Sequence, residues 1–314
     1  MKTSVIIVSW QSRLVLNECL QSINGQVQED REIIVVDNNS GDGTIEMIRS
    51  QFGYVILIES KINSGFSAAN NLAISTARGK YGLFLNPDTL VNSGTISEME
   101  SYLDSHPECM AVGPRVVDLD GNFSKPSVRR LPTIWYEFAD LFFLNRLLSR
   151  SRLFNGQYYP DSDRGNIINA ECLVGAALMV RLEAVRSLGG FDESVPLYLD
   201  DIDLCARLSK LGNLVYLPSA TVKHHHNASG RKQPLSLIVE LGLQARFVFL
   251  KKHNGKSQAR GYVVLVFLRG AIQLCAVPFL FLFSRGSYRS VFTQAATFLR
   301  WCFSNKSRQR CLPN

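Results

Sequence analysis

The sequence lacks any Cys-x-x-Cys pair. Its seven cysteines are scattered and odd in number, so neither a disulfide framework nor a cysteine-based zinc site is indicated. The N-terminus passes directly from a short polar start into a strand-like run, which is too brief for the apolar region of a signal peptide. We therefore expect a reducing, cytosolic setting. With 46% hydrophobic residues, the chain can bury a substantial core.

Glycine-rich phosphate loops are also missing. The turn after the first expected strand reads "SWQSRL", without glycine, which argues against the G-x-G-x-x-G turn of a Rossmann dinucleotide site. No G-x-x-x-x-G-K-[ST] loop occurs. If the ligand is a nucleotide, its diphosphate must be neutralised in another way, and a divalent cation held by a carboxylate and by phosphate oxygens would do so.

The last part of the chain has no acidic residue. Residues 241–314 contain twelve Lys or Arg and no Asp or Glu, and the whole chain carries +7. Residues 1–240 therefore carry about −5, from 22 basic and 27 acidic side chains. Long aliphatic runs interleave with these basic residues, which favours an anionic lipid surface over nucleic acid.

The apolar run from Gly261 to Phe283 is about long enough to span a membrane, but Arg269, Gln273 and Pro278 interrupt it. An arginine near the middle of a span costs roughly 2.5–3.5 kcal/mol. We expect helices that lie in the membrane interface rather than a transmembrane anchor. The alternative is a buried helical hairpin with a solvated basic face.

The first third of the chain alternates strands and helices. Apolar runs at 4–9, 32–37, 54–60 and 81–85 predict buried strands, and helical patterns lie between them, including one at 65–79. This alternation predicts an α/β fold with a mostly parallel central sheet that is covered on both faces.

After about residue 110 the pattern changes. A hairpin with Asp120-Gly121 at its turn is followed by an irregular, basic and aromatic stretch. A strand then runs into a helix that ends at Gly189-Gly190, an acidic helix covers 198–212, and "LVYLP" and "ATVKHHH" predict two short strands. We expect a catalytic domain at 1–232, divided near residue 115, and a basic, apolar helical region at 233–314.

Two expected strands end in carboxylates. Asp37 follows "EIIVV", and Asp88 follows "YGLFLNP", where Pro87 stops the strand. In an open parallel sheet, ligands bind beyond the carboxyl ends of the strands. Asp88 is thus a candidate metal ligand, and His224 or its two histidine neighbours could supply another. The plainer alternatives are a turn at Asn-Pro-Asp, a helix cap at Asp37 and a polar surface loop at the histidines.

Asp200, Asp201 and Asp203 crowd one helix N-terminus. The helix dipole favours carboxylates there, and capping explains one of them. Three within four residues repel one another, and such repulsion can raise a pKa enough to make a general base.

These segments together resemble the family 2 glycosyltransferases with the GT-A fold, and in particular a rhamnosyltransferase-like branch that builds bacterial surface polysaccharide. The resemblance covers roughly residues 3–230. It rests on seven motifs in order: "VVDNNSGDGT", "NSGFSAANN", "FLNPDT", "LVGAALMVR", "GGFDE", "LYLDDIDLCARL" and "VKHHHNAS". The "NPD" tripeptide resembles that branch's version of the D-x-D metal motif.

The resemblance implies roles for individual residues. Asp201 matches the catalytic base, and His224 matches a histidine near the metal and the diphosphate. Asp37 is expected to contact the base or ribose of the donor. "SWQS" departs from the usual Tyr-Asn-Ser, which leaves the nucleotide open between UDP and dTDP. The implied donor-site residues are Ser9, Trp10, Asp37, Asn39, Asn63, Gly65, Asn70, Asn86 and Asp88, and the implied acceptor-side residues are Gly175 and Asp200.

The implied activity is metal-dependent, inverting sugar transfer with Mg²⁺ or Mn²⁺. The resemblance favours rhamnose from dTDP-rhamnose and a lipid-linked saccharide acceptor, at the cytoplasmic face of a bacterial inner membrane. Open alternatives are a UDP-linked hexose or N-acetylhexosamine, and a non-catalytic homologue that binds sugar nucleotides. A nucleotidylyltransferase should carry a glycine-rich first loop, which is absent here.

Overall fold

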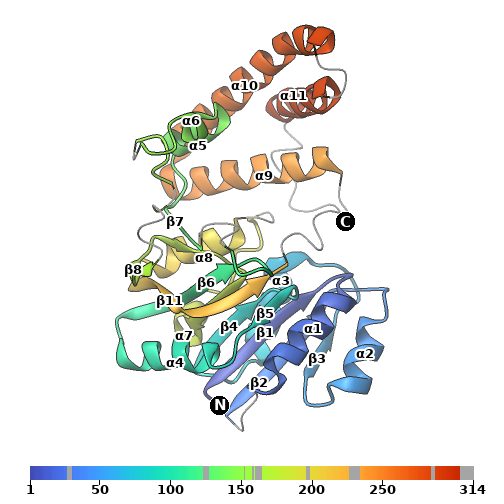
Figure 1. The fold of residues 1–314 in the computed structure, drawn as a ribbon, viewed down its shortest axis with the longest axis vertical. Coiled ribbons are helices and arrows are strands. Elements are labelled where there is room, and N and C mark those ends of the chain that lie inside the picture. The colour runs from blue at the N-terminus through green and yellow to red at the C-terminus, as the bar shows by residue number, and fades with distance from the viewer. Residues whose placement is uncertain are drawn as a thin grey trace.

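The computed structural model describes residues 1–26, 30–122, 127–151, 153–157, 159, 165–195, 199–225, 234–283 and 287–304. Strands and their covering helices form the lower part of the molecule in Figure 1, and a group of helices stands above them.

The central sheet follows the order β3-β2-β1-β4-β10-β6-β11-β5, and β8 pairs with β11. The pairs β1–β2, β1–β4, β2–β3 and β6–β11 are parallel. β10 runs antiparallel between β4 and β6. The predicted α/β fold with a mostly parallel sheet is confirmed. The strands are β1 Thr3–Ser9, β2 Arg31–Asp37, β3 Ile56–Glu59, β4 Tyr81–Leu85, β5 Thr89–Val91, β6 Cys109–Val117, β8 Ile168–Asn169, β10 Ala177–Arg181 and β11 Asn213–His224.

Helices cover both faces because the strands are apolar on both sides. In β1, Val5 and Ile7 belong to one core cluster, while Ile6 and Val8 belong to the other. Helices α1, α2 and α4 contribute to the first cluster, and α3, α7 and α8 to the second. Their bounds are α1 Arg13–Asn24, α2 Thr44–Gln51, α3 Gly65–Thr76, α4 Thr95–Ser105, α7 Leu182–Ser187 and α8 Asp200–Leu208.

Three local expectations needed correction. The segments "LVYLP" and "ATVKHHH", expected as two short strands, form one strand, β11. This strand is irregular between Leu217 and Thr221 but continues its pairing with β6. The third strand is shorter than 54–60. The hairpin turn forms, with the Asp118 N–H donating to the Asn122 carbonyl at 2.8 Å, but the next strand, β7 Val128–Arg129, pairs with β9 Cys172–Leu173 instead of β6.

The upper helices come from two distant parts of the chain. They are α5 Ile134–Leu141 and α6 Leu144–Leu147, then α9 Leu235–Phe249, the π-helix η3 Leu250–Asn254, α10 Lys256–Phe283 and α11 Ser287–Phe303. Buried Glu137 of α5 pairs with Arg246 of α9 at 2.9 Å. Helix α5, from the expected catalytic domain at 1–232, thus packs with helices of the expected C-terminal region at 233–314. The division between the two regions stays a prediction.

Asp203 ties these helices to the sheet layer. Its carboxylate is fully buried and accepts hydrogen bonds from Arg207 in its own helix at 2.8 Å and from His253 of η3 at 2.7 Å. Lys252 of η3 lies 2.7 Å from the same carboxylate. Burial opposes ionisation, but His253, Lys252 and Arg207 hold the pKa of Asp203 at about 2.

A buried ion pair also locks α4 to the sheet. Arg31 of β2 and Glu100 of α4 form two hydrogen bonds, of 2.9 and 2.8 Å, and the Thr3 hydroxyl donates to Glu100 at 2.6 Å. Burial opposes the charge, but these donors hold the pKa of Glu100 below its usual value.

We predict that Glu100→Ala lowers the free energy of unfolding by about 3–5 kcal/mol, because it leaves the Arg31 guanidinium buried without its partner. Glu108→Ala, at an exposed carboxylate just after α4, is the control and should change stability by less than about 0.5 kcal/mol. Urea unfolding measures both. Equal losses in the two variants would mean that the buried pair contributes nothing specific.

Candidate active site

Asp88 lies in the turn between β4 and β5. Pro87 ends the pairing of β4, and the Asn86 N–H then donates to the Ala176 carbonyl at 2.9 Å. The Thr89 hydroxyl donates to the same carbonyl at 3.3 Å. Asp88 is thereby fixed, largely buried, just beyond the carboxyl end of a central strand.

His224 reaches Asp88 through strand pairing. β11 runs antiparallel to β5 and places His224 opposite Thr89. The His224 Nε2 lies 2.9 Å from the Asp88 Oδ1 and 3.5 Å from the Asn86 Nδ2. The structure therefore brings together Asn86, Asp88 and His224. His225 lies 3.2 Å from Glu18, and His226 lies outside the described residues.

These residues suit a cation that is shared with a ligand. Within the described residues, no group of three or more His, Cys, Asp or Glu side chains could hold a metal by itself. Asp88 and His224 offer one carboxylate and one imidazole at the same point. Mg²⁺ is commonly bound by one or two carboxylates together with substrate phosphates, so this pair fits such an ion.

Asp37 ends β2 and is fully buried. Its Oδ2 accepts a hydrogen bond from the Ser40 N–H at 2.9 Å. Among the described residues the Oδ1 atom has no hydrogen-bond partner, so the carboxylate keeps an acceptor for a ligand hydroxyl. Burial raises the pKa of Asp37, although the Ser40 N–H opposes that rise.

The loop that contains Asn63 and Gly65 is held by Asn38. The Asn38 amide donates to the Asn63 Oδ1 at 2.8 Å and accepts from the Ser64 N–H at 3.0 Å. Gly65 adopts φ +84°, a conformation that glycine reaches at little cost. Asn38 is thus a supporting residue. Its position directly after Asp37 at the end of a strand was the signal for it in the sequence.

The remaining donor-side residues lie around this edge. Ser9 ends β1, and its hydroxyl is 2.8 Å from that of Ser12. Trp10 is half-buried next to it, and Asn39 is exposed with φ 64°. Asn70 is buried within α3, and its amide donates to the Phe66 carbonyl at 2.9 Å. Ser9 and Asn70 therefore bind protein groups in this structure.

Asp201 is the second residue of α8 and faces Gly175. Its Oδ2 accepts from the Gly175 N–H at 2.8 Å, and its Oδ1 from the Ile202 N–H at 2.9 Å. A Cβ on Gly175 would lie 2.9 Å from the Asp201 Oδ2, so no other residue fits there without displacing the carboxylate. The two expected acceptor-side residues, Gly175 and buried Asp200, lie beside Asp201, and their role stays a prediction.

Burial, rather than crowding by Asp200 and Asp203, raises the pKa of Asp201. The Gly175 N–H and the charge of Arg129 oppose that rise. Asp203 is committed to its three partners, Arg207, Lys252 and His253, and is not available as a base. Arg129 was missed by the sequence reasoning. The only sequence feature at its position was the irregular, basic and aromatic stretch, for which we predicted no role.

One backbone segment touches both halves of the site. The Ala176 carbonyl holds the turn of Asp88, and the adjacent Gly175 N–H holds Asp201. The expected metal ligand and the expected base are therefore positioned by two consecutive residues. A carboxylate–imidazole pair on one side and a carboxylate of raised pKa on the other suit transfer from a charged leaving group to a hydroxyl.

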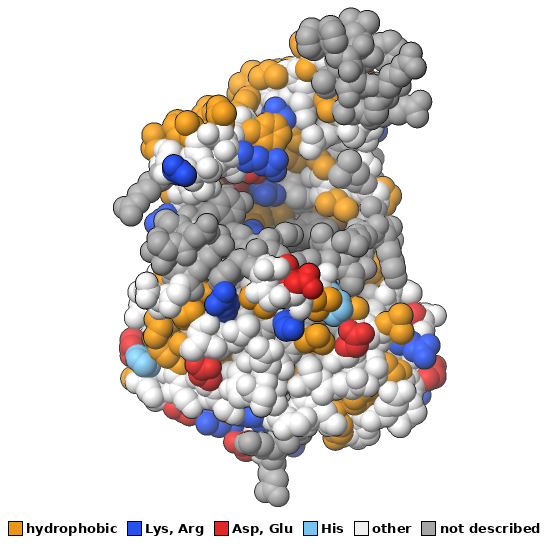
Figure 2. Space-filling view, viewed as in Figure 1, with side chains coloured by type: hydrophobic (Ala, Val, Ile, Leu, Met, Phe, Trp, Pro, Cys, Tyr) orange, Lys and Arg blue, Asp and Glu red, His pale blue; other side chains and the backbone are white. Residues whose placement is uncertain are grey.

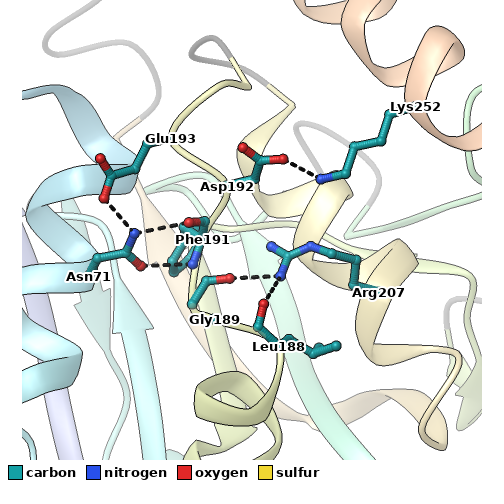
Figure 3. A pocket seen from close by; sticks show the side chains of 9 residues that line it. Asn71, Leu188, Gly189, Phe191, Asp192, Glu193, Arg207 and Lys252 are labelled. Atoms are coloured by element: carbon teal, nitrogen blue, oxygen red, sulfur yellow. Dashed lines mark hydrogen bonds and ion pairs between the residues drawn. The ribbon is translucent and has the colours of Figure 1, made fainter.

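Figure 3 shows a cavity formed by the "GGFDE" loop, α3, α8 and η3. Asn71 of α3 accepts from the Phe191 N–H at 2.8 Å and donates to the Phe191 carbonyl and to Glu193, both at 2.9 Å. Arg207 donates to the Gly190 carbonyl at 2.7 Å, and Lys252 pairs with Asp192. These side chains hold the loop in place.

Comparisons with known proteins identify relatives of this chain. The family model described as glycosyl transferase family 2 matches residues 4–166. The chain is 26% identical over 273 residues to N-acetylglucosaminyl-diphospho-decaprenol L-rhamnosyltransferase of Mycobacterium tuberculosis, covering 80% of this chain and 85% of that protein. It is 25% identical over 233 residues to rhamnosyltransferase WbbL of Escherichia coli, covering 71% and 84%.

Solved structures show the same fold. Mannosyltransferase PcManGT from Pyrobaculum calidifontis, in complex with GDP-Man and Mn²⁺, matches with a TM-score of 0.58 at 17% identity, over 97% of this chain and 87% of that one. Staphylococcus aureus TarS in complex with UDP matches with a TM-score of 0.55 at 16% identity, over 93% and 75%. The chain belongs to glycosyl transferase family 2 and is a glycosyltransferase of class EC 2.4.1.- with the GT-A fold.

Proposed function

We propose that the protein transfers rhamnose from dTDP-rhamnose to a lipid-linked saccharide, with inversion at the anomeric carbon, in the synthesis of O-antigen or another surface polysaccharide. The observation that carries the proposal is the Gly175–Ala176 segment, which holds the Asp88–His224 pair and Asp201 at one place. The choice of rhamnose and of a lipid-linked acceptor is supported by the names of two relatives, one of which is a diphospho-decaprenol rhamnosyltransferase.

On the donor side, Asp37 would accept a hydroxyl of the nucleoside through its Oδ1, while Asn38 keeps the loop of Asn63 and Gly65 against it. Asp88 and His224 would hold a Mg²⁺ or Mn²⁺ ion, which when bound supplies positive charge to the leaving diphosphate. PcManGT was solved with Mn²⁺, which supports the same use of metal here.

On the acceptor side, Asp201 would take the proton of the attacking hydroxyl. The hydroxyl is essentially unionised at neutral pH, so a positioned base is needed. Burial raises the pKa of Asp201, which makes its ionised form a stronger base. The two N–H groups of Gly175 and Ile202 orient the carboxylate. One displacement then breaks the bond to the diphosphate and forms the new glycosidic bond.

A UDP-linked hexose or N-acetylhexosamine is the second candidate donor, because TarS structures contain UDP and UDP-GlcNAc. A panel of dTDP-, UDP- and GDP-sugars, offered with a prenyl-diphosphate N-acetylglucosamine acceptor, separates the two. We expect product with dTDP-rhamnose, detected by mass spectrometry. Product formed with a UDP-sugar in its place would contradict the choice of rhamnose and leave the site assignment standing.

Asp201→Asn should lower kcat by a factor of about 10²–10⁴. Donor affinity should change no more than about threefold, because the base acts on the acceptor. Donor binding by calorimetry and transfer by radiolabel measure the two effects. Asp120→Asn, at an exposed turn, is the control. Transfer near the parent rate in Asp201→Asn would move the role to another group.

Asp88→Ala should weaken donor binding at least about tenfold in Mg²⁺ or Mn²⁺ and far less in EDTA, because its proposed action depends on the cation. His224→Ala should show a milder form of the same metal dependence, and His226→Ala is the comparison. Equal losses for Asp88→Ala with and without metal would make Asp88 a structural turn residue. Identical behaviour of the two histidine variants would show that His224 is the wrong histidine.

A further inference from the structure

Helix α10 is apolar on two sides. Its inner side is buried at a spacing of three or four residues, at Ala259, Tyr262, Val266, Gly270 and Gln273. Its outer side exposes Val264, Phe267, Leu268 and Ile272, which are also spaced as one helical face. It is the one helix among the described residues that is long and apolar enough to cross a membrane, and only 22% of its apolar window is buried. The core helix of a soluble domain would be mostly buried.

The turn between α5 and α6 extends this exposed surface. Ile134 at the start of α5 lies so close to α10 that a Cβ on Gly261 would be 2.5 Å from it. Further along, the guanidinium of Arg269 lies 4.4 Å from the centre of the Phe143 ring. The large apolar side chains exposed on α5, on α6 and on the residues directly before and after α6 are Trp135, Phe143, Leu147 and Leu148.

We call the eight exposed side chains of these two segments the apolar face. Figure 2 shows hydrophobic side chains gathered on the upper part of the molecule, where Figure 1 places α5, α6 and α10, with Lys and Arg nearby. The apolar face comprises Trp135, Phe143, Leu147, Leu148, Val264, Phe267, Leu268 and Ile272.

We propose that the apolar face docks on an anionic lipid bilayer. Charge favours lipid over a second copy of the chain, because residues 241–314, which include α10, contain no Asp or Glu that could pair with the basic side chains of another copy. Lys251, Lys256 and Arg260 are exposed near the start of α10. Basic side chains beside an apolar helix face suit anionic headgroups at the membrane interface.

The helices lie in the interface and do not cross the bilayer. The Gln273 amide of α10 donates to the Gln294 side chain of α11 at 2.6 Å, so α10 cannot insert without α11. Helix α11 carries exposed Arg300, and Arg269 lies on the Phe143 ring. Moving either arginine into hydrocarbon is costly.

The inference goes beyond the proposed transfer reaction and depends on neither the donor nor the acceptor. Binding is therefore measured without them, by flotation of the full-length protein with vesicles of phosphatidylcholine alone or mixed with phosphatidylglycerol. We expect binding to the anionic vesicles at low salt and weaker binding in 0.5 M NaCl, because salt screens the attraction to the headgroups.

Two substitutions test the apolar face itself. Leu147→Asp and Ile272→Asp change its two segments separately, and each should weaken vesicle binding at least about tenfold. Leu14→Asp in α1 is the matched control, because Leu14 is 78% exposed and Leu147 is 79% exposed, and it should bind like the parent. Point variants are preferable to truncation, since removal of η3 and α9 would take Lys252 and His253 away from buried Asp203 and Arg246 away from buried Glu137.

Four outcomes would overturn the proposal. The parent could stay free of anionic vesicles at low salt, or both face variants could bind as well as the parent. Resistance to extraction by sodium carbonate would show a spanning helix in place of an interfacial one. Concentration-dependent dimers that are lost in both variants, without vesicle binding, would assign the face to a second copy. Circular dichroism confirms that each variant is folded.

Discussion

The site depends on one strand, β10, which runs antiparallel to both of its neighbours in a mostly parallel sheet. β10 lies between β4 and β6 and pairs with both in the antiparallel sense, so its first residues lie at the carboxyl end of β4, where parallel sheets bind ligands. Ala176 therefore meets Asn86, and Gly175 meets Asp201. Had β10 run parallel, its start would lie at the opposite edge of the sheet, and the two carboxylates would have no common support.

Two aspartates in the first turn of helix α8 hold it by contacts on opposite faces. Asp201 points to Gly175, while Asp203, two residues on, points to the other side of the helix and is bound by His253 of η3. Successive residues differ by about 100° around a helix, so a spacing of two places these side chains on roughly opposite faces. The orientation of the expected base thus depends on η3, the π-helix that precedes α10.

The sequence was sufficient where a local pattern carries the information. Buried strands are continuous apolar runs, so their ends, and with them Asp37 and Asp88, could be located from the chain alone. The contact of His224 with Asp88 joins residues 136 positions apart through the pairing of β5 with β11. The residues alone left the second ligand open among His224 and its two histidine neighbours, and the family resemblance selected His224. The cause of the raised pKa of Asp201 is burial, which depends on packing that no run of three aspartates reveals. The packing of α5 against the C-terminal helices could not be predicted from the sequence either, because Glu137 and Arg246, which pair there, are far apart in the chain.

The uneven distribution of charge along the chain acts in two ways. Some basic residues of the C-terminal region are neutralised by acids from the first part: Arg246 by buried Glu137, and Lys252 by Asp192 and Asp203. These pairs are partly or wholly shielded from solvent, so salt screens them less than it screens exposed charges. Lys251 and Lys256 remain exposed on the same region. Because the first set fastens the helices to the catalytic layer and the second is available to headgroups, salt should release the protein from a membrane well before it separates those helices from the sheet.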